Sequence, residues 1–237
     1  MYKQINSMDE LEKYLSISFN NKSILKIALT HSSYANQKRQ VEYNERLEYL
    51  GDAVLELTIT EYLFRRYKEK SEGDLTKIRS LIVCENSLYE IAQNLSLGKY
   101  MLMSKGEELT GGRERNSILA DCVEALIAAI YLDSGLEAAR DFIIINFKDI
   151  MERAVSNKII LDYKTKLQEV IQSKGEISIT YNLINSEGPA HRPTFEVELI
   201  INGETKSRGV GFSKKEAEQN AAKILLETME NRESENE

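Results

Sequence analysis

The sequence predicts a mainly α protein in which an all-helical domain is followed by a small α+β domain. Before about residue 160, apolar residues recur three or four positions apart, which is the spacing of one helix face. After that point they alternate with polar residues, as strands require, and both prolines, Pro189 and Pro193, lie there. We expect a helical domain at 1–155, a linker at 156–161, the α+β domain at 162–230 and an acidic, frayed tail at 231–237.

The helical domain is expected to begin at a capping box formed by Ser7 and Glu10. Pairs and triplets with helical spacing then follow in one segment after another: Leu11 and Leu15; Ile24, Leu25 and Leu29; Val54 and Leu57; Ile78, Leu81 and Ile82; Leu88, Ile91 and Leu95. These segments predict helices throughout this part of the chain.

The second domain reads as one helix, three strands and a second helix. A helix is expected from Asp162, and alternating apolar residues predict strands around 177–183 and 195–199. Asn202-Gly203 is a two-residue hairpin signal that leads into a third strand at about 204–210. A capping box from Ser213 to Glu216 should open the last helix.

Composition limits the classes of protein to consider. Hydrophobic residues make up 42% of the 237 residues and charged residues 29%, as in folded water-soluble proteins, and no apolar run has the length of a membrane span. Cys84 and Cys122 form no metal-binding or disulfide pattern, so reduced thiols and a cytoplasmic location are expected. A net charge of −7 excludes a uniformly basic nucleic-acid binder.

An acidic row marks the segment from residue 44 to 57. Glu45, Glu48, Asp52 and Glu56 fall three or four apart, so on a helix they share a face, beside an apolar row of Leu47, Leu50, Val54 and Leu57. Carboxylates at this spacing repel one another, so the helix is stable only if water or cations screen their charges. Spacing alone favours a solvated face and leaves a metal site open.

A second acidic pair lies in a segment that must be buried. Asp121 and Glu124 are the only charged residues between Ile118 and Ile130, and they share a helix face. A buried carboxylate must be neutralised, paired or bound to a metal ion. Two interpretations remain open, namely salt bridges to Arg46, Arg113 or Arg115, and a site for Mg²⁺ or Mn²⁺.

The amino-acid sequences of these motifs resemble those of ribonuclease III, the endonuclease that cuts double-stranded RNA. The matching segments occur in order: ALTHSSY at 28–34, NERLEYLGDAVL at 44–55, SEGDL at 71–75, GGR at 111–113, and SILAD at 117–121 running into EAL at 124–126. The resemblance extends over nearly the whole chain.

The resemblance implies a homodimeric endonuclease that uses Mg²⁺, with Mn²⁺ as a possible substitute, and neither an organic cofactor nor a membrane. By motif position, Glu48, Asp121 and Glu124 would be metal ligands, and Asp52 would complete the catalytic site with Glu124. Glu45 and Glu72 would support it. Two-metal-ion hydrolysis would leave 5′-phosphate and 3′-hydroxyl ends, in the processing of rRNA and mRNA.

Gly51 and His31 each have two interpretations. Glycine within a helix costs about 1 kcal/mol relative to alanine, which a close helix contact at the dimer interface or ordinary core packing could offset. His31 is expected to be a hydrogen-bonded structural residue rather than a metal ligand, because no histidine or cysteine lies near it in the sequence.

The C-terminal domain resembles the double-stranded-RNA-binding domain of bacterial ribonuclease III, on its element order and on GVGFSKKEAE at 209–218. Ser213, Lys214 and Lys215 would offer a helix N-terminus and two cations to phosphate. The family's two minor-groove contacts match Thr165 and Gln168 on the first helix, and the loop that holds His191. Ten Lys or Arg against eleven Asp or Glu in 157–230 predict a small, focused patch. A solvated helix start is the alternative for the lysines.

The leading hypothesis is therefore a metal-dependent endoribonuclease for double-stranded RNA. The alternative is a double-stranded-RNA-binding protein that does not cleave. The four acidic positions, Glu48, Asp52, Asp121 and Glu124, favour the enzyme.

Overall fold

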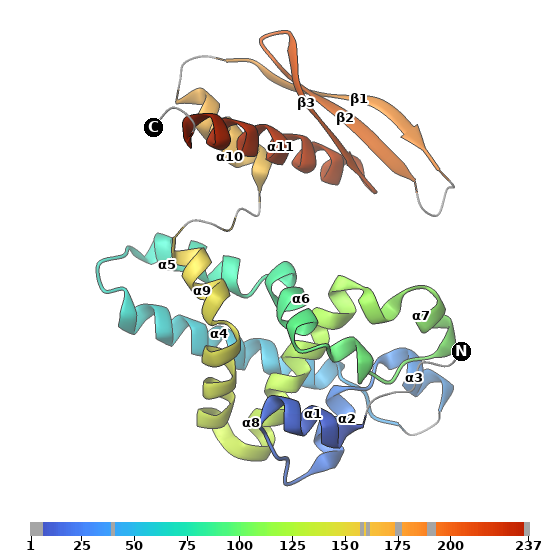
Figure 1. Ribbon diagram of the computed structural model, residues 1–237. Helices are drawn as coiled ribbons and strands as arrows, with labels where there is room; N and C mark the ends of the chain where they lie inside the picture. The colour runs from blue at the N-terminus through green and yellow to red at the C-terminus, as the bar shows by residue number, and fades with distance from the viewer. Residues whose placement is uncertain are drawn as a thin grey trace. The chain divides into compact units, whose positions relative to one another are not determined.

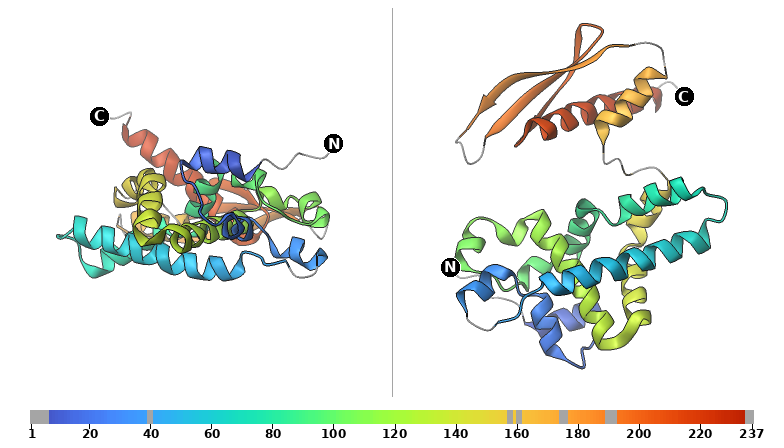
Figure 2. Two further views of the ribbon diagram at one scale, coloured as in Figure 1. Left: turned by 90° about the horizontal axis from the view of Figure 1, so that it is seen from below. Right: turned by 180° about the vertical axis from the view of Figure 1, so that it is seen from behind.

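The computed structural model divides the chain into two compact units, Met1–Ile159 and Ile160–Glu237. It describes residues 7–38, 41–156, 159, 162–173, 177–188 and 193–234. Each unit is described by itself, and Figures 1 and 2 show the elements of both. Of the predicted linker, only Ser156 and Ile159 are described. The domain boundaries given above stay a prediction.

The described elements of the first unit are helices, as the sequence predicts, apart from an isolated bridge between Thr30 and Leu102. Its elements in order are α1 (Met8–Leu15), α2 (Lys22–Ala28), α3 (Ser32–Gln37), α4 (Glu45–Arg66), α5 (Glu72–Ile82), α6 (Glu85–Asn94), the short 3₁₀ turn η1 (Leu97–Lys99), α7 (Lys105–Leu109), the 3₁₀ turn η2 (Gly112–Glu114), α8 (Asn116–Asn146) and α9 (Lys148–Val155). The Ser7–Glu10 capping box is present at the start of α1.

The core of this unit is built around α8, which crosses α4 (Figure 1). Every residue from Ile118 to Ile130 is buried except Asp121 and Glu124, which are half-buried. Leu55, Ile59 and Leu63 of α4 are buried in the same core. The prediction of a buried acidic helix is thus confirmed.

One apolar residue of α4 lies on a different face from the one predicted. Leu57 is 57% exposed, whereas Leu47 and Val54 are buried. The core-facing row continues instead through Leu55 and Thr58. In a helix of 3.6 residues per turn, a row followed in steps of three drifts around the axis, and Leu57 falls outside the buried stripe.

Helix α8 bends at Gly135, whose φ of 87° and ψ of 176° are not helical. A positive φ of this kind is accessible to glycine without steric cost. The bend gives the second half of α8 a new direction, and that half carries Ala139, Phe142 and Ile143 into the core.

The second unit consists of α10 (Tyr163–Gln172), β1 (Ile179–Glu187), β2 (Thr194–Ile201), β3 (Glu204–Gly211) and α11 (Lys214–Ser234). The three strands form one antiparallel sheet in the order β1-β2-β3, and both helices lie on the same face of it (Figures 1 and 2). The core joins Leu167 and Ile171 of α10, Leu199 of β2, and Ala221, Ala222, Leu225 and Leu226 of α11. The predicted element order is confirmed.

In this unit one local prediction holds and another needs correction. Asn202 and Gly203 have φ values of 51° and 82°, the positive values that a type I′ hairpin turn requires. At Gly209, an added Cβ would lie 2.2 Å from the carbonyl oxygen of Ala217, so α11 packs directly on the backbone of β3. The tail expected from residue 231 is wrong in its first part, because α11 continues to Ser234, and 235–237 lie outside the described residues.

None of the helices among the described residues is both long enough and apolar enough to span a bilayer.

Candidate metal centre

A close contact between α4 and α8 positions the acidic residues of both helices. Gly51 packs against the backbone of Glu124, and a Cβ at Gly51 would lie 1.8 Å from the Glu124 carbonyl oxygen. No real side chain fits that space, so glycine is the residue that allows this approach. The close helix contact predicted for Gly51 therefore exists, but it lies inside one chain rather than between two copies.

Three carboxylates meet where the helices approach. Glu48 of α4 and Asp121 and Glu124 of α8 each offer an oxygen atom that lies within 4.8 Å of the others. All three side chains are half-buried. Each residue is one of the metal ligands expected from the sequence, and oxygen donors of this kind suit Mg²⁺ and Mn²⁺.

Negative charge dominates the electrostatics of the cluster, although the charge of His31 lowers the pKa of Asp121 in part. The pKa of Glu124 is raised to about 8, first by burial and then by the negative charges of Asp52, Glu48 and Asp121. Burial, followed by the charge of Asp121, also raises the pKa of Glu48. The pKa of Asp121 is raised first by burial and then by the charge of Glu85. A divalent cation would relieve all three costs at once.

The salt-bridge alternative is not supported. Arg113 pairs with Glu108 at 2.7 Å and also donates to the carbonyls of Gly98 and Met101. Arg115 pairs with Glu107 at 2.5 Å. Arg46 is exposed, and across the described ranges no lysine or arginine forms a salt bridge with Glu48, Asp121 or Glu124. The donor set thus fits a metal ion better than it fits an internal ion pair.

Asp52 and Glu45 flank this group. Both are exposed and belong to α4, one turn after and one turn before Glu48. Asp52 raises the pKa of Glu124, and Glu45 raises that of Glu48 and Asp121, so both charges act on the cluster without joining its tight oxygen group. Glu56, further along the row, is exposed.

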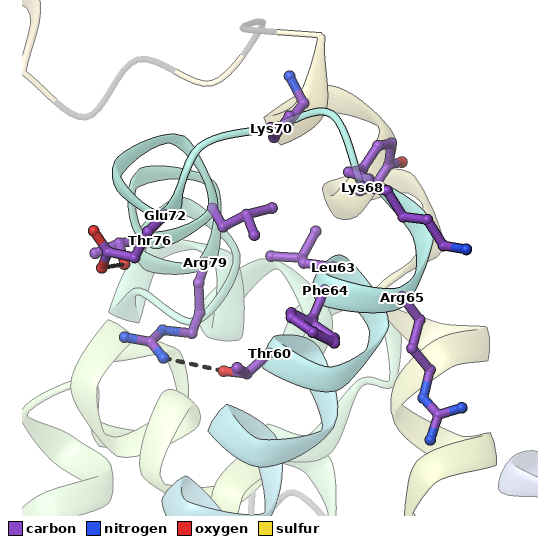
Figure 3. Close-up of a pocket in the computed structure, with 11 residues that line it drawn as sticks. Thr60, Leu63, Phe64, Arg65, Lys68, Lys70, Glu72, Thr76 and Arg79 are labelled. Atoms are coloured by element: carbon purple, nitrogen blue, oxygen red, sulfur yellow. Dashed lines mark hydrogen bonds between the residues drawn. The ribbon is translucent and has the colours of Figure 1, made fainter.

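The structure places Glu72 apart from the cluster. It lies in the first turn of α5 and accepts a hydrogen bond from Thr76 at 3.0 Å (Figure 3). Beside it, Arg79 donates to Thr60 of α4 at 3.0 Å. Thr60 follows Glu48 by twelve residues, which is about 18 Å along a helix. A supporting role for Glu72 stays a prediction that the geometry of a single chain does not explain.

Glu85 is an acidic neighbour that the sequence did not reveal. It opens α6, is exposed, and its charge raises the pKa of Asp121. No periodic pattern links residue 85 to residue 121. Their proximity follows from the packing of α6 against α8, which only the fold shows.

His31 is a structural residue, as expected. It is the N-cap of α3, where its Nδ1 accepts from the Ser33 backbone N–H at 3.3 Å. Its ring also makes a 2.8 Å hydrogen bond with the Ser33 hydroxyl, which in turn accepts from the Ser104 N–H. These contacts tie α3 to the segment before α7.

The predicted RNA-binding residues are exposed on two helices of the second unit. Thr165 and Gln168 share a face of α10, and the Thr165 hydroxyl donates to Asp162 at 2.8 Å. Lys214 and Lys215 are exposed in the first turn of α11. His191 lies outside the described residues.

The cap of α11 differs from the predicted capping box. The Ser213 hydroxyl accepts from the Glu216 N–H at 3.1 Å, as expected. The Glu216 carboxylate, however, accepts from the N–H of Phe212 at 2.7 Å rather than from that of Ser213. Its negative charge therefore lies at the same helix end as the two lysines.

Comparison with known proteins places the chain in a family. A family model described as ribonuclease-III-like matches residues 21–151, and one for the double-stranded RNA binding motif matches 163–229. The chain belongs to the ribonuclease III family. The relative named ribonuclease 3 from Clostridium perfringens is 62% identical over 227 residues, which are 96% of this chain and 95% of the relative. Ribonuclease 3 from Clostridium tetani is 61% identical over 223 residues, 94% and 95% of the two chains.

A solved structure agrees for the first unit. The nuclease domain of ribonuclease III from Campylobacter jejuni is 43% identical, with a TM-score of 0.57, over 60% of this chain and 97% of that one. The resemblance stated from the motifs is therefore confirmed, both for the family and for the fold.

Proposed function

We propose that this protein is a divalent-metal-dependent endoribonuclease that hydrolyses double-stranded RNA. The observation that supports this most is the group of three carboxylates, Glu48, Asp121 and Glu124, whose oxygen atoms lie within 4.8 Å of one another between two helices. None of the three forms a salt bridge with a lysine or arginine of the described residues. Membership of the ribonuclease III family and the match to an RNA-binding motif support the choice of substrate.

The three carboxylates would hold Mg²⁺, with Mn²⁺ as a substitute, and Asp52 and Glu45 would add negative charge around it. Bound in pairs, such ions lower the pKa of an attacking water and stabilise charge on the leaving oxygen. Water adds to phosphorus, the bond from phosphorus to the 3′ oxygen breaks, and that oxygen takes up a proton. The products are a 5′-phosphate and a 3′-hydroxyl.

The residues of this chain position the reaction. The half-buried Glu48, Asp121 and Glu124 fix the ligand oxygens on two rigid helices, and the contact at Gly51 sets the spacing of those helices. Asp52, exposed one turn beyond Glu48, can accept a hydrogen bond from the attacking water. Rigid placement of this kind supplies much of the advantage of a catalytic site.

The second unit would hold the duplex. Lys214 and Lys215 at the start of α11 would bind phosphates, while Thr165 and Gln168 would reach the minor groove, with His191 from the neighbouring loop. Modules of this kind read the shape of about 16 base pairs through phosphates and 2′-hydroxyl groups. The negative charge of Glu216 limits the extent of the patch, in keeping with the small, focused patch that the sequence predicts.

A homodimer would supply one site for each RNA strand. One face of α4 carries Tyr49, Leu57 and Phe64, which are 83%, 57% and 70% exposed. Phe64 lies beside a hollow of about 960 Å³ between α4 and α5 (Figure 3). Exposed apolar surface of this kind marks an interface. For the Campylobacter jejuni nuclease domain, a region involved in dimer formation has been described.

Sedimentation tests the dimer. The wild-type protein should sediment as a dimer, and Leu57→Glu, which places a charge within the apolar face, should shift it to monomer. A monomeric wild-type protein would exclude this part of the proposal.

The free thiols of Cys84 and Cys122 suit a reducing cytoplasm, where rRNA and mRNA precursors are processed.

Cleavage of a long RNA duplex with Mg²⁺ tests the enzyme. Wild-type protein should cut, Glu124→Gln should lose at least about 10³-fold in rate because a metal ligand is lost, and Glu56→Gln, a matched change at an exposed acid of α4, should cut normally. All three should bind the duplex equally. If wild-type protein binds but never cuts, with either Mg²⁺ or Mn²⁺, it is the non-cleaving RNA-binding protein of the alternative hypothesis.

A further inference from the structure

The first helix of the second unit begins at a carboxylate that receives three hydrogen bonds. Asp162 is the N-cap of α10, and its Oδ1 accepts from the backbone N–H of Thr165 at 3.0 Å. The same oxygen accepts from the side-chain amide of Gln219 in α11 at 2.8 Å. The other oxygen, Oδ2, accepts from the Thr165 hydroxyl at 2.8 Å. Asp162 therefore connects the start of α10 both to α11 and to the hydroxyl that is expected to reach the minor groove.

Neighbouring contacts fix the orientation of these groups. The Gln219 carbonyl oxygen Oε1 accepts from the backbone N–H of Lys164 at 3.3 Å, so the amide nitrogen Nε2 is the atom that faces Asp162. The Lys164 ammonium pairs with Glu218 of α11 at 2.6 Å. Both helices lie on the same face of the sheet and pack against each other (Figure 1). Atoms of two helices thus hold the Asp162 carboxylate in one position.

Charge decides the direction of the hydrogen bond between Thr165 and Asp162. Hydrogen bonds, first from Gln219 and then from Thr165, lower the pKa of Asp162 to about 2, so this carboxylate is ionised at neutral pH. An ionised carboxylate can only accept, whereas a hydroxyl has one proton to donate and two lone pairs that accept. The Thr165 proton is therefore committed to Asp162. Thr165 is exposed, and its oxygen offers lone pairs to whatever binds there.

Helix capping alone does not explain this arrangement. A cap needs a side-chain oxygen that accepts from a backbone N–H of the first turn, and Oδ1 of Asp162 already does so. In the capping box of α1, the third helical residue, Glu10, returns a hydrogen bond to the backbone of Ser7. At α10 the third residue is Thr165, and its side chain donates to the cap carboxylate instead. This bond uses the hydroxyl proton without satisfying another backbone group of the helix.

We propose that Asp162 is a specificity-determining positioning residue, which makes the Thr165 oxygen an acceptor toward the duplex and so selects ribose over deoxyribose. The inference rests on the proposed function, in which Thr165 reaches the minor groove. A 2′-hydroxyl has a proton to donate to that oxygen, and it is the group that lets a protein distinguish RNA from DNA. Deoxyribose has no donor at this position, so the Thr165 oxygen would lose its partner.

Binding to two duplexes of one sequence tests this assignment, with the full chain and with EDTA present so that neither duplex is cut. The first duplex is RNA, and the second is its 2′-O-methyl derivative, in which each 2′ oxygen can accept but cannot donate. Thr165→Val removes the hydroxyl at nearly constant shape. It should weaken RNA binding about fivefold, as the loss of one hydrogen bond does, and leave binding of the methylated duplex unchanged. If both affinities fall equally, Thr165 is not an acceptor and the proposal is wrong.

Asp162→Asn reverses the polarity and keeps the cap, because asparagine is as good an N-cap as aspartate. Its oxygen retains the bonds from Gln219 and from the Thr165 N–H, so its Nδ2 donates to the Thr165 hydroxyl and the hydroxyl proton turns outward. The methylated duplex should then bind about fivefold more tightly, while RNA, whose 2′-hydroxyl can also accept, should bind nearly as before. An unchanged ratio of the two affinities, or equal weakening of both, would mean that Asp162 only caps the helix.

Glu198→Gln is the matched control. Glu198 also accepts from a threonine hydroxyl, that of Thr205 at 3.2 Å, but this pair joins β2 to β3. Its ratio of affinities should equal that of wild type, and an equal change in this variant would overturn the proposal. Melting shows whether each variant folds, and if Asp162→Asn does not, the result for Thr165→Val decides alone. Wild type that binds neither duplex would overturn the proposed function itself, whereas normal RNA binding with unchanged ratios in both variants would overturn this inference only.

Discussion

The two units place their functional residues in opposite ways. In the helical unit, Glu48, Asp121 and Glu124 are half-buried, and burial and neighbouring negative charges raise the pKa of each. Bringing these carboxylates together therefore lowers the stability of the metal-free fold. In the α+β unit, Lys214 and Lys215 are exposed at the start of a helix and do not lower the stability of the fold. The difference implies that changes in the first site should alter chemistry and stability together, whereas changes in the second should alter binding alone.

The largest combined effect on stability and activity is expected from Gly51→Ala. Its Cβ would lie 1.8 Å from the Glu124 carbonyl oxygen, so α4 and α8 must separate. Overpacking of this kind typically costs about 1–3 kcal/mol, and a shift of about 1 Å in a catalytic site can cost on the order of 10²-fold in rate. The melting temperature and the rate of duplex cleavage should both fall.

Gly209→Ala is the matched change in the other unit, where the new Cβ would meet the Ala217 carbonyl oxygen at 2.2 Å. It should destabilise the RNA-binding unit while leaving metal binding to the acidic cluster intact. Equal loss of metal binding in both variants would remove the claim that the Gly51 contact sets the metal centre.

The next effect is on RNA affinity. Replacing both Lys214 and Lys215 with Ala removes two cations from the start of α11, so duplex binding should weaken by about tenfold or more in low salt. The plot of log affinity against log salt should become less steep by about two units at most. Melting should stay unchanged because both side chains are exposed. An unchanged salt slope would show that these lysines are merely solvated.

Sequence patterns could pick out the two halves of the acidic cluster because each half lies on one helix, although spacing alone left a metal site open. Asp121 and Glu124 stood out as the only charges in a segment that had to be buried, and burial of that segment is confirmed. The two halves come together because Gly51 of α4 lets α8 approach closely, and this role of Gly51 could be recognised only once α8 was known to pack against it. The patterns did not reveal Glu85, the bend at Gly135 or the exposure of Leu57, because each depends on how helices pack.

A smaller effect is expected on the stability of the metal-free protein. Glu124→Gln removes a carboxyl whose pKa is raised to about 8 from its ordinary value of 4.5. Below about pH 4.5 the carboxyl is protonated in both the folded and the unfolded state and costs nothing; as pH rises toward 8, the unfolded state alone loses the proton, and wild-type stability falls. The variant avoids this loss.

Thermal melting in EDTA tests whether the metal-free wild type loses stability relative to Glu124→Gln as pH rises. Above pH 8, Glu124→Gln should melt roughly 2–4 °C higher than wild type, and the difference should vanish near pH 4. Added Mg²⁺ should raise the melting temperature of wild type more than that of the variant. A variant less stable than wild type at pH 8 without metal would mean that Glu124 carries a structural hydrogen bond instead.

The smallest effect concerns Asp162, the N-cap of α10. Hydrogen bonds from Gln219, at 2.8 Å, and from Thr165 lower its pKa to about 2 from 3.8. A lowered pKa contributes stability that is present above about pH 3.8 and is lost as pH falls toward 2. Asp162→Ala should therefore cost about 1 kcal/mol near neutral pH, as cap removal does, and almost nothing at pH 2. Because the Thr165 hydroxyl donates to Asp162, the variant also frees that hydroxyl. If Thr165→Val weakens duplex binding and Asp162→Ala does not, Thr165 itself makes the RNA contact. If both variants weaken binding equally, the end of the helix makes the contact rather than the hydroxyl.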